Sequence, residues 1–383
     1  MTFTDDMAGG TGTGVTGHPP LRCPRCGGAL HAEDGQDAGP RGPYGEPGGS
    51  AGPYGPYGEP GGSAGSRDDV RGAGGPRGQE AQDGEQDGEN ALRCSGCGAG
   101  YPVDRGIPRF VPRDGYADGF GLQWTRHRLT QLDSHVGMPI SRDRLMTAGG
   151  WSAGDLRGRT VLECGSGAGR FTEVLCETGA LVTSFDLSGA VHANAASNGR
   201  FPNLRLLRAS VYELPLPRES FDVVVCLGVI QHTPDVRRAF TTLMGHLKPG
   251  GRFCVDVYAA PIAYPHLRQL IRPFTRRMPP ERLYPLVERA VPRLLPLSTA
   301  LSAVPGVGQG LARLVPVANH RHLGLKDAGT ELEWSVLDTF DWFSPRYEKP
   351  QFRRTIRRWT GELGLREVSI VRRRGMYVVR GVK

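Results

Sequence analysis

Thirteen residues near the middle of the chain carry the strongest structural signal: Arg159-Thr-Val-Leu-Glu-Cys-Gly-Ser-Gly-Ala-Gly-Arg-Phe171. The first of them are apolar and β-branched, as expected at the end of a short buried strand. Three glycines follow at alternate positions, Gly165, Gly167 and Gly169, and the residues after them have the pattern of an amphipathic helix. A strand, a glycine turn and a helix together open a nucleotide-binding βαβ unit. Glycine lets the backbone bend sharply and lets a ligand approach without a Cβ in the way.

The glycine spacing narrows the kind of ligand. Dinucleotide-binding loops have the spacing G-x-G-x-x-G, whereas this loop has G-x-G-x-G and places Arg170 where the third glycine would stand. A helix start crowded by Arg170 suits a pyrophosphate poorly, and it suits a cofactor whose carboxylate and amine lie over the loop. Because this short pattern also occurs in ordinary loops, the assignment depends on the elements that follow.

Further strand-like segments follow the loop at regular intervals. Residues 181–185 form a second apolar segment that ends in Asp186, 21 residues after Gly165. A carboxylate at this position can accept hydrogen bonds from both hydroxyls of an unphosphorylated ribose. The remaining segments lie at 204–207, at 220–227 and at 247–257, the last of which contains a Pro-Gly-Gly turn.

In their order and spacing these segments resemble the class I S-adenosylmethionine-dependent methyltransferases. The resemblance covers about residues 155–258, and it implies an α/β fold with a Rossmann-like seven-stranded sheet. The last two strands of such a sheet form an antiparallel hairpin, for which the candidates are 364–371 and 375–380, joined by the arginines 372–374. The matching pieces are Glu163-Cys-Gly-Ser-Gly-Ala-Gly169, Asp186, Ser220-Phe-Asp222, His232-Thr-Pro-Asp235 and Leu247-Lys-Pro-Gly-Gly251.

The resemblance also implies S-adenosyl-L-methionine as the cofactor and a set of residues that would hold it. The methionine part would contact the loop and the residue before it, the ribose would contact Asp186, and the adenine would contact the residues after the second and third strands. In chain order the candidates are Glu163, Gly165, Gly167, Gly169, Asp186, Leu187, Ser210, Val211, Cys226 and Leu227.

His232, in the loop after the fourth strand, is the candidate catalytic base. Methyl transfer needs a base only where the acceptor must lose a proton on attack. The alternative is that His232 is a packing residue in a helix-capping turn.

Two C-x-x-C knuckles with the shared pattern Leu-Arg-Cys-x-x-Cys-Gly lie far apart in the chain. Together their four thiolates complete a tetrahedral zinc site; the alternative is a redox pair or two idle knuckles. The segments 21–30 and 92–112 resemble the Trm112-like zinc ribbons, with the ending Tyr101-Pro-Val-x-x-Gly-Ile-Pro108 as the best match. The predicted zinc ligands are Cys23, Cys26, Cys94 and Cys97, whereas the other four cysteines occur singly in apolar segments and are predicted to be buried free thiols.

The rest of the N-terminal part has the composition of disordered chain. Residues 32–91 are rich in Gly, Pro, Asp, Glu and Gln, and an eleven-residue repeat occurs in them at 42–52 and at 55–65. We expect a disordered insertion, which the ribbon tolerates because the cost of loop closure grows only with the logarithm of length. Residues 1–20 are predicted to be a disordered tail without the basic and apolar regions of a signal peptide.

Composition bounds the class of protein. The chain has 383 residues, eight cysteines and a net charge of +8, which is compatible with an anionic partner. No run of about 18 apolar residues is present, so we expect no transmembrane segment. Cysteines in such a chain favour metal sites or free thiols over disulfides, and we expect a cytoplasmic protein. The sequence does not predict the oligomeric state.

The predicted domains are the zinc ribbon at 21–112, the core at 113–258, a mainly helical cap insert at 259–345, and a C-terminal helix and hairpin at 346–383. Prolines are expected to break the helices of the insert.

Three helical or aromatic segments flank the catalytic core in this scheme. Residues 118–133 predict one amphipathic helix, in which Gln123 and Trp124 either touch the cofactor or pack on the sheet. Residues 333–347 combine tryptophans and phenylalanines with Asp338 and Asp341, which indicates an acceptor pocket or a latch between insert and core. Residues 351–363 predict a final helix with an apolar stripe of Phe352, Ile356, Trp359 and Leu363.

Two functions compete. The first is a methyltransferase for a small-molecule acceptor such as a natural product, a saccharide or a lipid-linked intermediate. The second is a ribosomal RNA or tRNA methyltransferase, in which the ribbon aids RNA binding and the arginines of 353–358 and 372–374 contact phosphates. In a third interpretation the ribbon only docks a partner protein. The large insert with its aromatic residues favours the first.

Overall fold

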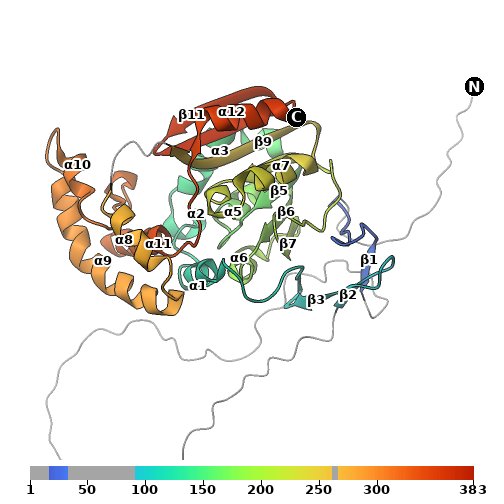
Figure 1. The fold of residues 1–383 in the computed structure, drawn as a ribbon, viewed down its shortest axis with the longest axis horizontal. Helices are drawn as coiled ribbons and strands as arrows, with labels where there is room; N and C mark the ends of the chain where they lie inside the picture. The colour runs from blue at the N-terminus through green and yellow to red at the C-terminus, as the bar shows by residue number, and fades with distance from the viewer. Residues whose placement is uncertain (1–16, 33–90, 261–265) are drawn as a thin grey trace, which may run out of the picture.

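The computed structural model describes residues 17–32, 91–260 and 266–383, which form a large sheet with helices on both faces, a small N-terminal sheet and a helical cap (Figure 1). The predicted disordered insertion lies almost wholly outside the described residues, as does most of the predicted tail. The end of that tail is described: His18 Nδ1 lies 3.2 Å from Thr183 Oγ1.

The large sheet has the Rossmann-like α/β arrangement, with the strand order β11-β12-β9-β8-β5-β6-β7. The strands from β5 to β9 run parallel, and β12 is antiparallel to both β9 and β11. A further two-residue strand, β10, pairs with the end of β9. The bounds are β5 Thr160–Cys164, β6 Leu181–Asp186, β7 Leu204–Arg208, β8 Phe221–Cys226, β9 Leu247–Ala260, β10 Gln351–Phe352, β11 Arg366–Arg373 and β12 Met376–Val382.

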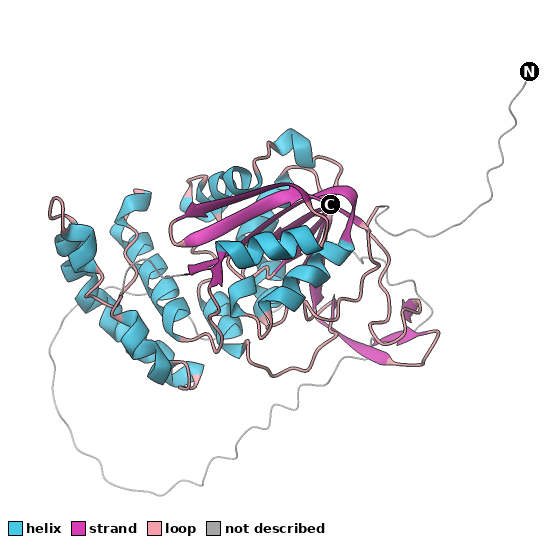
Figure 2. Ribbon diagram, turned by 45° about the horizontal axis from the view of Figure 1, so that its top comes forward, coloured by secondary structure: helices cyan, strands magenta, loops and turns pink. Residues whose placement is uncertain are grey.

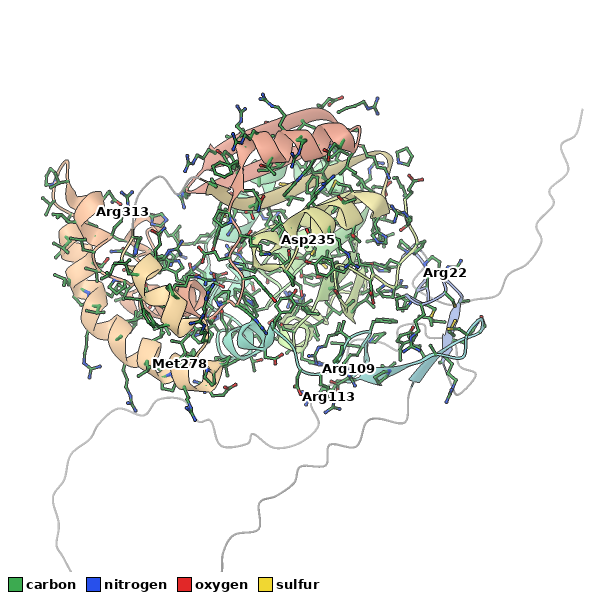
Figure 3. All side chains as sticks on the ribbon, viewed as in Figure 1. Arg22, Arg109, Arg113, Asp235, Met278 and Arg313 are labelled. Carbon is green, nitrogen blue, oxygen red and sulfur yellow. The ribbon has the colours of Figure 1, made fainter. Side chains whose placement is uncertain are left out.

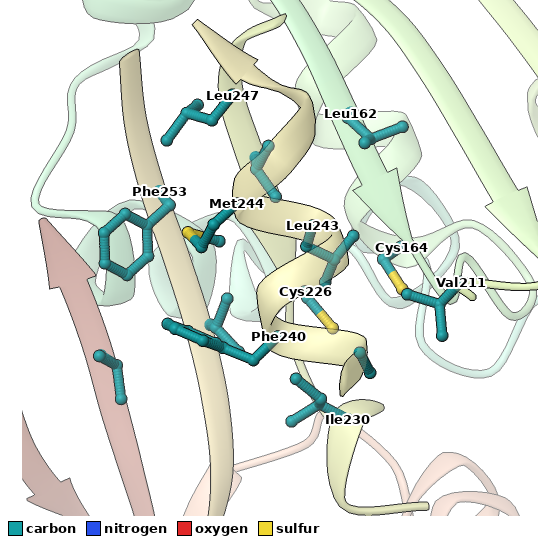
Figure 4. Packing of buried hydrophobic residues seen from close by; sticks show 14 of the residues in the cluster. Leu162, Cys164, Val211, Cys226, Ile230, Phe240, Leu243, Met244, Leu247 and Phe253 are labelled. Atoms are coloured by element: carbon teal, nitrogen blue, oxygen red, sulfur yellow. The ribbon is translucent and has the colours of Figure 1, made fainter. Parts of the chain in front are cut away.

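Helices cover both faces of this sheet, so its central strands are apolar on both sides. Helices α3 (Ile140–Gly149), α5 (Arg170–Glu177) and α6 (Ala190–Asn198) pack on one face with Val161 and Val223 of the strands. Helices α7 (Val236–His246) and α12 (Arg353–Glu362) pack on the other face with Leu162 and Val224. Figure 4 shows the second layer, in which Phe240, Leu243 and Met244 of α7 point at β9 and its neighbours.

The C-terminal hairpin is longer than predicted. Arg372 and Arg373 belong to β11, so the predicted three-arginine linker is wrong. The turn consists of Arg374 and Gly375, whose φ angles of 46° and 82° fit a two-residue hairpin turn.

The helix before the hairpin is shorter than predicted. It begins at Arg353, because Phe352 is extended, pairs with β9 and is 45% exposed. Phe352 therefore does not belong to the apolar stripe, whereas Ile356 and Trp359 are buried in the core as expected.

The predicted helix over 118–133 is split into α1 (Asp118–Arg126) and α2 (Asp133–Val136). His127 does not have helical backbone angles. Its buried Nε2 and the Tyr284 hydroxyl oxygen are 2.9 Å apart and share a hydrogen bond. Thr130 donates a 2.8 Å hydrogen bond to Glu333. These contacts to the cap outweigh the local helical pattern.

The small sheet has the order β1-β2-β3-β4 and lies beside β7. The Phe110 amide donates to the Arg208 carbonyl at 2.9 Å, and the Arg22 amide donates to the Pro215 carbonyl at 2.9 Å. Main-chain hydrogen bonds thus attach this segment to the edge of the large sheet. The strand bounds are β1 Leu30–Ala32, β2 Ala91–Cys94, β3 Gly100–Asp104 and β4 Ile107–Pro108.

The cap consists of α8 (Arg268–Thr275), α9 (Pro280–Ser302), α10 (Gly308–Ala312) and α11 (Ala328–Phe343). Figures 1 and 2 place it at the end of the molecule away from the small sheet. It has its own apolar cluster, to which α9 contributes Leu283 and Val291, and α11 contributes Phe340. Helix α9 runs through Pro285, Pro292 and Pro296, so the expected breaks at these prolines are wrong. Among the described helices, none is long and apolar enough to cross a membrane.

Candidate cofactor and acceptor site

The glycine loop joins β5 to α5 in a conformation that requires glycine. The φ angles of Gly165, Gly167 and Gly169 are 73°, 51° and 92°, in the left-handed region. A Cβ on Gly165 would lie 2.4 Å from a Val229 methyl, and one on Gly169 would lie 2.2 Å from the Asn194 Oδ1. Both the backbone conformation and the close neighbours therefore exclude a side chain at Gly165 and Gly169.

Glu163 lies at the end of β5, directly before the loop, and is only 2% exposed. Its Oε2 accepts a 2.5 Å hydrogen bond from the Thr172 hydroxyl, while Oε1 has no partner among the described residues. Burial raises the pKa of Glu163 to about 7, against the opposing effect of hydrogen bonds from Thr172 and Ser184. A cationic ligand group at Oε1 would complete this site.

Asp186 lies at the end of β6, opposite the loop. Its Oδ2 accepts a 3.0 Å hydrogen bond from the Gly167 amide, and its Oδ1 accepts bonds from the amide and hydroxyl of Ser188 at 2.8 and 2.7 Å. The carboxylate therefore shapes the glycine loop itself. Its predicted contact with a ribose remains a prediction.

Helix α1 covers the loop. A Cβ on Gly167 would lie 2.9 Å from the Trp124 indole, so this ring rests on the loop. The neighbouring Gln123 is 1% exposed, and neither atom of its amide has a partner among the described residues. Unpartnered buried polar atoms are rare in folded proteins and need an explanation.

Ser166 Oγ and the side-chain amide of Gln231, a residue that follows β8, are also buried without a hydrogen-bond partner among the described residues. With Glu163 Oε1, these unpartnered groups surround the carboxyl ends of β5 and β8. Carboxylate, amide and hydroxyl groups together suit a ligand that carries an amine, a carboxylate and hydroxyls, as S-adenosylmethionine does. Ser166 belongs to the loop 165–169 that was predicted to hold the methionine part, although only its glycines were named, whereas Gln231 was not predicted because no spacing rule marks it.

The other predicted cofactor residues lie nearby but mostly face the core. Val211 and Cys226 are buried in the cluster under α7, and Leu227 is buried in the cluster on the other face. Ser210 Oγ accepts a hydrogen bond from the Tyr212 amide at 3.2 Å. The Leu187 carbonyl accepts one from Arg208 at 3.3 Å.

Arg170 does more than crowd the helix start. Its Nη1 donates to Gln131 Oε1 at 2.6 Å, its Nε donates to Ser141 Oγ at 3.1 Å, and its guanidinium lies 5.7 Å from the centre of the Trp334 ring. Burial, with the nearby charge of Arg144, lowers the pKa of Arg170 to about 9. Arg170 therefore connects the glycine loop to the cap helix α11.

His232 lies in the short helix η1 (Ile230–His232) after β8 and is 5% exposed. Its Nδ1 is 2.9 Å from the Tyr347 carbonyl oxygen, which can only accept, so in the neutral ring Nδ1 carries the proton and Nε2 the lone pair. This Nε2 is buried and has no partner among the described residues. Phe120 and Tyr258 enclose the ring at centroid distances of 5.6 and 5.5 Å.

The cap contributes Asp341 to the same place. Burial raises the pKa of Asp341, and the charge of a protonated His232 acts against this rise. Burial also raises the pKa of Tyr258, with the charge of Asp341 adding to the effect. Trp342, in contrast, packs inside the cap against His266 and Arg268, at 5.0 and 4.8 Å.

A cavity of about 170 Å³ lies beside Phe120, on the side of α1 that faces the cap. One wall carries Tyr116, whose ring lies 5.3 Å from that of Tyr347, and Phe120, which contacts His232. Burial raises the pKa of Tyr116, and Asp186 is among the nearby charges that add to it. Phe120 thus contacts both the cavity and the candidate base His232, which is not itself part of the lining. Its lining is Gly115, Tyr116, Asp118, Gly119, Phe120, Arg276, Met278, Pro280, Ser344, Pro345 and Arg346.

The four cysteines of the small sheet come together. Their sulfur atoms all lie within 4.8 Å of one another, and the Cys23–Cys97 and Cys26–Cys94 pairs are 3.7 and 3.4 Å apart. Four sulfurs around a zinc ion at about 2.3 Å would be roughly 3.8 Å apart in a tetrahedron. The donor set and its spacing therefore fit zinc.

The other four cysteines are buried, as predicted, but two of them are not isolated. Cys164 is hydrogen-bonded to Cys226, and this contact together with burial raises the pKa of the Cys164 thiol.

Comparison with known proteins identifies the type of domain. Residues 162–255 match the protein family described as "Methyltransferase domain". The chain is 31% identical over 100 residues to the ubiquinone biosynthesis O-methyltransferase of Coxiella burnetii, an alignment that covers 25% of this chain and 42% of that protein. It is 32% identical over 134 residues to a probable S-adenosylmethionine-dependent methyltransferase of Mycolicibacterium smegmatis, covering 35% of this chain and 51% of that protein.

The chain thus spans about half the length, or less, of these curated relatives. Among solved structures, an S-adenosylmethionine-dependent methyltransferase of Mesorhizobium loti is similar with a TM-score of 0.37 and 18% identity, covering 66% of this chain and 99% of that one. The magnesium protoporphyrin IX methyltransferase of Synechocystis PCC 6803 has a TM-score of 0.37 and 15% identity, covering 70% and 96%. The family match places a methyltransferase domain between β5 and β9.

Proposed function

We propose that this chain is an S-adenosylmethionine-dependent methyltransferase whose acceptor is a small molecule bound between the sheet and the cap. The observation that carries the proposal is the buried, unpartnered Nε2 of His232, which lies beside a wall of the cavity formed by Phe120. The methyltransferase domain match supports the chemistry.

S-adenosylmethionine, when bound, supplies an electrophilic methyl group for an in-line displacement. The protein contributes mainly position and the exclusion of water. Glu163 fits the amine of the cofactor, since its Oε1 is buried without a partner. Gln123 and Ser166 fit the carboxylate as donors, and Asp186 fits the ribose hydroxyls.

His232 accepts the proton that an acceptor hydroxyl or amine loses. Its Nε2 is the free acceptor, because Nδ1–H donates to the Tyr347 carbonyl. The same carbonyl holds the ring in place after protonation, and Asp341 offers a carboxyl group close to the resulting charge. Phe120 and Tyr258 keep bulk water from the ring.

The RNA alternative finds less support. Its candidate cations lie on α12 and the hairpin, whereas the cavity lies between residues 115–120 and the cap, and His232 follows β8. Among the arginines near α12, Arg358 and Arg237 pair with Glu362 at 3.7 and 2.8 Å. Such exposed pairs are worth little individually. A cavity of about 170 Å³ fits a compact group better than a folded RNA.

The zinc assignment belongs to the same proposal. We infer that Cys23, Cys26, Cys94 and Cys97 hold one structural zinc ion. The main-chain bonds between the small sheet and β7 support a stabilising role for this unit.

The acceptor assignment is tested by comparing Phe120→Ala with the double variant Arg357→Ala/Arg358→Ala. We expect the Phe120 variant to lose acceptor turnover while cofactor affinity, measured by calorimetry, is retained. We expect the arginine variant, and a change from about 50 to 200 mM salt, to have little effect. The reverse pattern would favour RNA.

A further inference from the structure

The cap exposes an unusual share of apolar side chains. Ten large hydrophobic residues are exposed in the described part of the chain, and seven of them lie between 270 and 314. The two most exposed, Leu270 at 70% and Phe274 at 76%, are both on α8. Solubility alone gives no reason to gather such residues on one subdomain.

On both α8 and α9 the exposed apolar residues share a helix face with arginines. On α8 and just after it, Leu270, Phe274 and Arg277 are four and three residues apart, which places them on one side. On α9 the exposed Leu286, Arg293 and Leu297 likewise follow one another at seven and four residues. We call these six residues the cap face. The opposite side of α9 is buried in the cap cluster, so the cap face is not needed for folding.

Positive charge is concentrated in the same segment. Residues 266–317 contain eight arginines and two glutamates, which gives +6 of the net charge of +8 of the whole chain. Arg268 and Arg272 pair with Glu348. In the described part of the chain, Arg277 and Arg293 form no ion pair with a carboxylate; Arg293 donates a hydrogen bond to the Arg289 carbonyl, which leaves its charge unneutralised.

Interleaved leucine and arginine side chains match one anionic partner best. Nucleic acids are bound by cations combined with stacked aromatic rings, but the cap face has a single aromatic residue, Phe274. A helix that lies in a membrane interface combines large apolar residues with arginines that reach the lipid phosphates.

We propose that the cap face docks on an anionic lipid bilayer, with Leu270 and Phe274 in the acyl boundary and Arg277 and Arg293 at the headgroups. Arg276, Met278 (labelled in Figure 3) and Pro280, which follow α8, line the cavity beside Phe120, the residue that contacts His232. Docking therefore brings the cavity mouth to the membrane, where an amphiphilic acceptor can enter. This last step rests on the proposed function, whereas the docking itself does not.

The test is co-sedimentation of the full chain with vesicles of phosphatidylcholine that contain about one third phosphatidylglycerol, against vesicles of phosphatidylcholine alone. We expect binding to the anionic vesicles only. Leu270→Ser/Phe274→Ser should weaken the partition about 30-fold or more. Arg277→Gln/Arg293→Gln should also weaken it about 30-fold.

The matched control is Phe352→Ser/Val371→Ser, which removes two exposed apolar residues, 45% and 43% exposed, outside the cap. This control should bind vesicles as the wild type does. An unchanged melting temperature shows that each variant is folded. Cofactor affinity is measured without vesicles, so it tests the proposed function separately from membrane docking.

Three outcomes would overturn the proposal. The first is no binding to anionic vesicles by the wild type. The second is binding that survives the leucine–phenylalanine change. The third is a different partner for the same face, seen as arginine-dependent binding of polyuridylate without vesicle binding, or as a dimer in sedimentation velocity that the leucine–phenylalanine change converts to monomer.

Discussion

In the proposed mechanism, His232 is the residue on which the chemistry depends most. Replacing it with Asn removes the Nε2 lone pair from the acceptor side, and we expect turnover to fall about 10²–10⁴-fold, the usual range for a lost general base. Cofactor affinity should hold, because no cofactor group is assigned to this ring. Single-turnover kinetics with calorimetry separates the two effects.

A matched control exists in His246, which is also 5% exposed and also places Nδ1 2.9 Å from a main-chain carbonyl, that of Pro217. It lies at the end of α7, away from the loop. If His232→Asn and His246→Asn reduce turnover equally, His232 is a packing residue.

The raised pKa of Glu163 predicts that cofactor binding releases a proton. This pKa of about 7 means that the ligand-free protein holds this carboxyl mostly protonated near pH 6. Because the folded-state value lies above the ordinary value of 4.5, the group destabilises the ligand-free fold progressively as the pH rises from 4.5 towards 7. A cofactor amine at Oε1 favours the ionised carboxylate, so binding near pH 6 should release up to about 0.9 proton.

Calorimetry in two buffers of different ionisation enthalpy measures this release. The variant Glu163→Gln should bind more weakly and release no proton from this position. Release that is unchanged in the variant would show that another group titrates.

For single residues, the sequence was sufficient where the role of a residue depends on its spacing from near neighbours in the chain. The three alternating glycines predicted a tight loop, and each of them has a positive φ angle in the structure. The position of Asp186 was predicted from the usual length of a βαβ unit. Gln231 was missed, and Ser166 was not singled out within its predicted loop, because both side chains stand out only by being buried without partners. That property depends on which distant helices cover them.

Among the elements, the small sheet gives the clearest prediction. The purified chain should carry close to one equivalent of zinc, since four thiolates at this spacing suit a structural zinc site. Cys94→Ser should release the metal and lower the melting temperature, because the sheet is attached to β7 by main-chain bonds. Metal analysis and thermal unfolding measure both.

Cys176→Ala serves as the control, since this buried cysteine lies on α5 and belongs to no cluster of potential metal ligands in the described residues. It should retain the zinc. Full zinc content in the Cys94 variant would rule out the assignment.

Element boundaries were predicted well where packing and local pattern agree, and poorly where they do not. The strands β5 to β8 match their apolar segments to within a residue or two. Helix α9 continues through three prolines because Leu283, Tyr284 and Val287 on its buried side hold it in place. The helix before the core ends at Arg126 because His127 turns towards Tyr284 of the cap, a contact that no local pattern reveals.

For the whole molecule, the sequence predicted the order of the layers and a helical insert that caps the sheet, but not the contacts that hold the cap in place. Parallel strands with intervening helices and a final hairpin leave few topologies, so the arrangement of the large sheet follows from its motifs. The segment 266–343 has helical patterns throughout, yet its placement depends on long-range contacts such as that between Arg170 and Trp334. The cavity that we propose for the acceptor is lined by residues of this segment together with residues of α1.

The measurement that tests the central claim most directly is methyl transfer by the purified full chain. The protein is incubated with methyl-labelled S-adenosylmethionine and with cell extract separated into an RNA fraction and a small-molecule fraction. We predict label in the small-molecule fraction, lost in His232→Asn and retained in His246→Asn. Label in the RNA fraction, or no transfer to either fraction by a protein that binds the cofactor, would contradict the account.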